Sequence, residues 1–134
     1  MNRALIAPLA LALAASIGAC GSSGESAIHE DALRDCLGKQ GATFGTAGQG
    51  ATGYAPLFHI AADFQGTMGG DSMNVFVEKD AARARSDAAD AEGALRAVGL
   101  QNPSNNLVEG RNVVIAFDRP PSGATRAAVR SCLE

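Results

Sequence analysis

The sequence predicts a small α+β fold, a two-layer sandwich of about three helices and an antiparallel or mixed sheet of three or four strands. Two patterns lead to this prediction. Apolar residues recur at every third or fourth position over residues 80–98, as on one helix face, and alternate over residues 73–78, as in a strand. Helical and strand segments are interspersed without an internal repeat, which favours one domain with helices packed against a sheet.

The first helix is expected over residues 28–39. Ser26 is a suitable N-cap, two acids in the first turn suit the helix dipole, and Gly38 or Gly41 ends the helix. His29 is expected on the surface. The apolar positions of this helix share one face and are Ile28, Ala32, Leu33, Cys36 and Leu37.

The segment after this helix is less regular. Residues 42–46 fit a short strand around Phe44, and four glycines within residues 45–53 indicate a loop. No Gly-Lys-Ser or Gly-Lys-Thr follows these glycines, so the loop is not expected to bind phosphate. Residues 57–64 fit either a short helix or a pair of strands, and residues 66–71 indicate another turn.

Residues 73–78 predict a central strand, because Phe76 makes its middle apolar on both faces. Its faces are Met73, Val75 and Val77 on one side and Asn74, Phe76 and Glu78 on the other. The following helix, residues 80–98, is capped by Asp80 and stopped by Gly99. Its buried stripe is mostly alanine, so it is expected to lie close against a sheet face. Ion pairs are expected between Arg83 and Asp87 and between Glu92 and Arg96.

Residues 107–118 predict a hairpin or a long bulged strand in which Gly110 turns the chain. Two prolines end this segment, and a serine caps a last helix over residues 123–133. The strands on either side of the long helix are expected to form a crossover unit or to run antiparallel.

The composition is mildly acidic and argues against nucleic-acid binding. The chain carries 11 Lys and Arg against 14 Asp and Glu, a net charge of −3, without a basic stripe in the sequence. Five Phe, one Tyr and no Trp leave few rings for stacking against bases or sugars. Nucleic acid is therefore not an expected partner.

The first twenty residues have the pattern of an export signal. Arg3 supplies a positive charge, residues 5–17 are apolar but too short to span a bilayer, and Ile17-Gly18-Ala19-Cys20 closes the segment. This segment resembles the signal peptide and lipobox of bacterial lipoprotein precursors. The resemblance implies cleavage between Ala19 and Cys20 and a diacylglyceryl group on the Cys20 thiol.

Three parts follow from this resemblance: a signal peptide over residues 1–19, a lipidated Cys20 with a flexible tether over residues 20–27, and one domain over residues 28–134. One acyl chain holds a protein only marginally on a bilayer, and each buried methylene contributes about 0.8 kcal/mol, so two chains hold it stably. The protein is therefore expected at the cell membrane, lipid-anchored on the extracytoplasmic face, with the membrane as its partner through Cys20.

The two remaining cysteines, Cys36 and Cys132, are expected to form a disulfide that joins the first and last helices. An even pair of cysteines in an exported protein is typical of a disulfide. Two free thiols in a redox or metal site are the alternative, although neither cysteine has a nearby Cys or His partner in the sequence.

The domain also carries three short structural motifs. They are Asp35-Cys36-Leu37 in the first helix, the strand Asn112 to Asp118 followed by Arg119-Pro120-Pro121, and the closing Arg130-Ser131-Cys132-Leu133. In these features the domain resembles small uncharacterised cell-envelope lipoproteins of high-GC bacteria. The resemblance implies no activity.

Two combinations of residues around His59 are candidates for chemistry. Asp63, four residues on, and Ser72 would complete the base, orienter and nucleophile of a hydrolase, but no Gly-x-Ser-x-Gly accompanies them. Met68 and Met73 would complete a soft copper site, although methionines beside Phe and Val are usually core residues. A hydrogen-bonded histidine and two core methionines are the simpler interpretation.

The acids Asp87, Asp90 and Glu92 lack the loop and the turn glycine of a calcium site and indicate a solvated helix face. The sequence therefore predicts a lipid-anchored cell-envelope lipoprotein that is not an enzyme, uses no cofactor, and binds or holds an envelope protein or small ligand. An extracytoplasmic copper-binding or redox accessory protein is the alternative, and a minor hydrolase is the third hypothesis.

Overall fold

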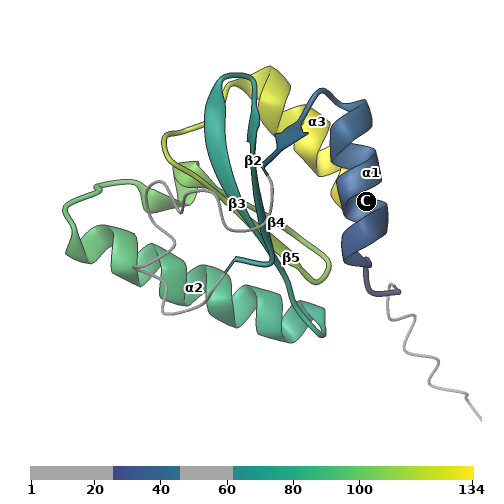
Figure 1. The fold of residues 1–134 in the computed structure, drawn as a ribbon. Coiled ribbons are helices and arrows are strands. Elements are labelled where there is room, and N and C mark those ends of the chain that lie inside the picture. The colour runs from purple at the N-terminus through teal and green to yellow at the C-terminus, as the bar shows by residue number, and fades with distance from the viewer. Residues whose placement is uncertain (1–25, 46–61) are drawn as a thin grey trace, which may run out of the picture.

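A computed structural model describes residues 26–45 and 62–134 and confirms the α+β class (Figure 1). The described residues contain three α-helices and one antiparallel sheet of five strands, where three or four strands were expected, in the order β1-β2-β3-β5-β4. The elements are α1 (Glu30–Lys39), β1 (Thr43–Phe44), β2 (Phe64–Met68), β3 (Asp71–Val77), α2 (Ala81–Ala97), the 3-10 helix η2 (Pro103–Asn106), β4 (Leu107–Gly110), β5 (Val113–Phe117) and α3 (Gly123–Leu133).

Helices cover both faces of the sheet, so the domain has three layers rather than the two expected (Figure 1). Leu33 and Leu37 of α1 and Val129 of α3 pack on one face, against a core that includes Met73, Val75, Ile115 and Phe117. The alanine stripe of α2 packs on the other face with Leu95, against Phe76, Val114 and Ala116. This second layer explains why β3 is apolar on both sides, as predicted for a central strand.

Helix α1 begins two residues later than expected and is not capped by Ser26. His29 occupies the N-cap position without a side-chain hydrogen bond, and it is exposed, as predicted. The Ser26 hydroxyl and carbonyl oxygens accept hydrogen bonds from Arg111 instead. Ser26 therefore fixes the start of the domain to the β4–β5 turn, and the helix starts only beyond Ile28.

Strand β2 runs through part of the segment expected to be a turn. Gly66 lies inside β2 and pairs with both Phe44 and Met73, and the turn is confined to Gly69 and Gly70, whose φ angles are 62° and 84°. A Cβ on Gly66 would lie 2.5 Å from the Thr43 carbonyl oxygen. Gly66 therefore allows β1 to pack closely against β2. In the sequence, a glycine with this role looks the same as a glycine in a turn.

Helix α2 closely matches its prediction. Asp80 Oδ1 accepts a hydrogen bond of 2.7 Å from the Arg83 backbone, and Gly99 follows the helix with φ 96°. Both expected ion pairs form, with 3.2 Å between Arg83 and Asp87 and 3.2 Å between Arg96 and Glu92.

Residues 107–118 form a hairpin, but Arg111 and Asn112 rather than Gly110 turn the chain. Arg111 has φ 52°, and Gly110 pairs with Val113 inside the ladder. A Cβ on Gly110 would lie 2.9 Å from Leu133 Cβ, so this glycine lets α3 approach the strand. Ser122 caps α3 as expected, and β5 runs antiparallel to β3, which excludes the crossover unit.

Candidate functional site

The disulfide between Cys36 and Cys132 forms as predicted and joins α1 to α3, with a Cα–Cα distance of 5.7 Å. Both cysteines lie on helix faces next to the buried stripe, and Cys132 packs against the larger core. The lipidation and cleavage residues predicted from the sequence, Ala19 and Cys20, lie outside the described residues.

The two methionines of the copper hypothesis are core residues. Met68 is 4% exposed and Met73 is 1% exposed, and both belong to the core between the sheet and helices α1 and α3. His59, the third ligand of that hypothesis, lies outside the described residues. Among residues 26–45 and 62–134, no group of three or more His, Cys, Asp or Glu side chains could hold a metal ion.

Asp63 and Ser72, two members of the hydrolase hypothesis, lie at opposite ends of the β2–β3 hairpin. Asp63 accepts a hydrogen bond of 2.6 Å from the Val77 backbone, while Ser72 pairs with Thr67 near the turn. Val77 lies five residue steps along the strand from Ser72, or roughly 16 Å away. The fold therefore does not bring this carboxylate and this hydroxyl together.

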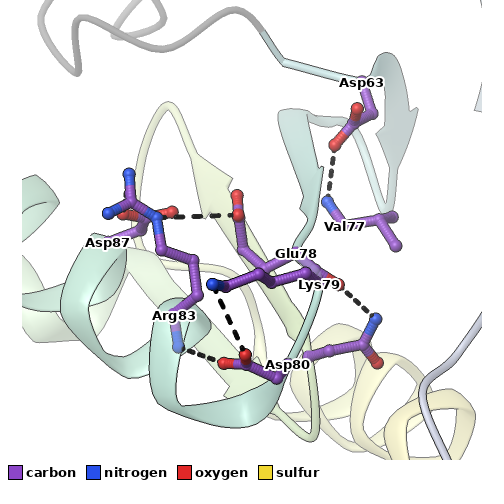
Figure 2. Close-up of polar contacts among 8 residues, drawn as sticks. Asp63, Val77, Glu78, Lys79, Asp80, Arg83 and Asp87 are labelled. Carbon is purple, nitrogen blue, oxygen red and sulfur yellow. Dashed lines mark hydrogen bonds and ion pairs between the residues drawn. The ribbon is translucent and has the colours of Figure 1, made fainter.

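A carboxyl pair between β3 and α2 was not expected as a unit. Asp87 was predicted on a solvated face with Asp90, yet its side chain is only 4% exposed, while Asp90 is exposed. Glu78, 17% exposed, lies beside it where the chain leaves β3 (Figure 2). Arg83, half exposed, lies 3.2 Å from Asp87 Oδ1 and 3.9 Å from Glu78 Oε2.

Glu78 holds its proton more tightly than an isolated carboxyl group would. Burial raises the pKa of Glu78 above its ordinary value, and a hydrogen bond to Asp87 and repulsion by its charge raise it further, against the opposing effect of Arg83. Neither oxygen of Asp87 otherwise accepts a hydrogen bond from the described residues, because the Arg83 contact is an ion pair without hydrogen-bond geometry. A proton on Glu78 supplies the missing donor.

The chemistry of this pair is limited by its surroundings. The hollow beside it, of about 420 Å³, is lined by Lys79, Asp80 and Arg111 but by neither carboxyl group. A second hollow, of about 410 Å³, lies beyond the far end of α2 and is lined by Asn102, Asn105 and Asp118 among others. Within residues 26–45 and 62–134, the carboxyl pair therefore has the features of a buried polar contact between β3 and α2, and neither carboxyl group lines these two hollows.

Sequence reasoning missed the pair for a definite reason. Glu78 precedes the cap of α2, so its distance from Asp87 in sequence, nine residues, matches no helical or strand period. The only available signal was the ion pair between Arg83 and Asp87, which places one carboxylate near the start of the helix.

No protein-family model matches the chain, and no curated protein or solved structure is significantly similar to it. Within residues 26–45 and 62–134, none of the helices is both long enough and apolar enough to cross a bilayer.

Proposed function

We propose that the protein is a lipid-anchored cell-envelope lipoprotein whose domain has a non-enzymatic binding or structural role outside the cytoplasm. The observation that carries this proposal is the disulfide between Cys36 and Cys132. Disulfides form and persist in oxidising compartments and are rare in the cytosol of mesophiles. The domain is therefore of a kind that suits export.

The disulfide also supports Cys20 as the site of lipidation. The chain has three cysteines, and the disulfide uses two of them, so Cys20 alone retains a thiol that can be acylated. Cys20 follows Ile17-Gly18-Ala19 at the end of an apolar segment, which is the position of the acylated cysteine in the lipoprotein precursors that this segment resembles. Ser26, six residues later, is exposed, so the chain enters the domain from its surface.

A binding or structural role agrees with how the candidate chemical groups are used. Asp63 holds two strands together, Met68 and Met73 fill the core, and Glu78 and Asp87 join a strand to a helix. None of the described residues favours the copper, redox or hydrolase alternatives over this role.

Intact mass and detergent phase partitioning of the protein expressed in a bacterial host test the proposal. The wild type should lose residues 1–19, gain the mass of an acylated cysteine and enter the detergent phase. Cys20→Ala should remain in the aqueous phase or keep its signal segment, whereas Cys132→Ala should still partition into detergent. A wild-type protein with unmodified Cys20 and an intact amino terminus would contradict the proposal.

A further inference from the structure

The edge of the sheet formed by β4 gathers four arginines that are scattered in the sequence. Arg85 lies on α2 at the border of a hollow of about 180 Å³ that Glu109 and Arg111 also line. Arg126 of α3 donates a hydrogen bond of 2.9 Å to the Leu107 carbonyl oxygen, on the outer side of β4. Arg130 follows one helical turn later on the same face of α3. We call Arg85, Arg111, Arg126 and Arg130 the arginine edge.

The arginine edge is positive in a domain that is otherwise acidic. Four of the 11 Lys and Arg residues lie on it, although the chain as a whole has a net charge of −3. Two acidic residues, Glu109 and Glu134, also lie at this edge, and the Glu134 backbone oxygen accepts a hydrogen bond from Arg111. None of the four arginines forms an ion pair with a carboxylate among the described residues, whereas Arg34, Arg96 and Arg119 each do. The side chains of Arg85 and Arg130 are exposed and have no hydrogen-bond partner in that part of the chain.

The arginine edge also lies where the chain enters the domain. Arg111 donates hydrogen bonds to the Ser26 carbonyl and hydroxyl oxygens, the latter at 3.0 Å. Six residue steps separate Ser26 from Cys20, and a fully extended chain covers at most roughly 20 Å in that number of steps. A domain of about 100 residues has a radius of gyration of about 13 Å, so this tether is shorter than the domain is wide.

We propose that the arginine edge is the surface on which the domain lies against the bilayer, with the guanidinium groups of Arg85 and Arg130 binding the phosphates of anionic phospholipids. The inference rests on the proposed lipid anchor at Cys20, which the short tether keeps close to Arg111. Arginine suits this role because its planar group binds phosphate oxygens in pairs and is weakly hydrated. Basic residues beside an anchor strengthen attachment to an anionic surface, and Arg85 and Arg130 are the exposed pair that can do so.

Hydrogen exchange of the mature protein, expressed in a bacterial host from the full-length sequence and mixed with vesicles, tests this orientation. On vesicles of phosphatidylcholine with phosphatidylglycerol, amides of residues 108–113 should exchange more slowly than on phosphatidylcholine alone, by about fivefold or more. The double variant Arg85→Gln, Arg130→Gln should lose this difference. Lys39→Gln with Arg96→Gln removes the same charge from other exposed sites and should retain it.

The outcomes separate this inference from the proposed function. Protein that floats with the vesicles but exchanges equally on both lipid compositions overturns the arginine edge and leaves the anchor in place. Loss of the difference in the Lys39 and Arg96 control also overturns it, because overall charge would then be the cause. Wild-type protein that floats with neither vesicle lacks the anchor, and both proposals are then wrong.

Discussion

Asn112 connects three distant segments through a single buried side chain. It is 2% exposed, and its Oδ1 accepts a hydrogen bond of 2.6 Å from Ile28 N. Its Nδ2 donates to the Ile28 carbonyl at 3.0 Å and to the Glu78 carbonyl at 2.7 Å. The start of the domain, the end of β3 and the β4–β5 turn are thus fixed to one another.

Replacing Asn112 by alanine should lower the free energy of unfolding by about 3 kcal/mol, because several buried backbone groups lose their partners. Urea unfolding followed by circular dichroism measures this loss. Asn105→Ala, at an exposed position, is the matched control and should change stability by less than about 0.5 kcal/mol. Equal small effects of the two variants would show that Asn112 is not a structural connector.

The Glu78–Asp87 pair makes stability depend on pH. Because the pKa of Glu78 is raised above the ordinary value of 4.5, the folded state holds its proton more tightly than the unfolded state does. The stabilising contribution of Glu78 is therefore complete below about pH 4.5 and is lost as the pH rises through the higher pKa of the folded state. At neutral pH the ionised Glu78 carboxylate therefore lowers the stability of the folded state relative to the protonated form.

Glu78→Gln should therefore stabilise the protein at pH 7, by about 1 kcal/mol, because the amide still donates to Asp87 without adding a second charge. The gain over the wild type should shrink as the pH falls toward 4.5. Thermal unfolding of both proteins at a series of pH values measures the difference. A constant difference across that series would contradict the raised pKa of Glu78.

Among the secondary-structure elements, the two predicted with the correct bounds to within one residue are α2 and α3. Each has a side-chain cap, Asp80 or Ser122, and each has an uninterrupted 3.6-residue period. The elements misjudged in sequence are those that tertiary contacts define. Strand β2 contains Gly66 because β1 pairs with it at a distance that leaves no room for a side chain. Helix α1 starts late because Arg111 and Asn112 form hydrogen bonds with Ser26 and Ile28, the residues before it.

Two glycine substitutions should have opposite effects on the elements that contain them. Gly66→Ala should destabilise the protein by about 1–3 kcal/mol, because its Cβ would meet Thr43 O at 2.5 Å and displace β1. Gly93→Ala, in the middle of α2 with no atom within 4 Å of its Cβ, should stabilise it by about 0.5–1 kcal/mol. Chemical denaturation of the two variants checks both signs, and destabilisation by Gly93→Ala would refute the open position assigned to it.

At the scale of the whole molecule, the sequence predicts the class of the fold better than its layers. The alternation around Phe76 correctly indicates a strand buried on both faces, but it does not indicate which helix covers which face. The arginine edge also could not be predicted from the sequence, because it depends on how the helices pack beside β4. Its members are separated by up to 45 residues and meet only because β4 lies between α2 and α3.

The disulfide should supply a large share of the stability of the domain. Cys36 and Cys132 are 96 residues apart, and closing a loop of this size removes unfolded-state entropy equivalent to about 4–5 kcal/mol. Cys132→Ser should therefore lower the melting temperature under oxidising conditions, and a reductant should lower that of the wild type to a similar value. Calorimetry with and without reductant measures both, and a wild type unaffected by reductant would contradict this role.

Arg111 donates hydrogen bonds to both Ser26 and the Glu134 carbonyl oxygen, so residues 26 and 134 lie side by side. A short linker would therefore join these positions with little strain, and the chain could be reopened at the exposed residues that follow α2. Such a circular permutant would keep the same fold while moving its first residue to the opposite pole of the domain. A lipid attached there would turn the molecule over and leave the arginines pointing away from the bilayer.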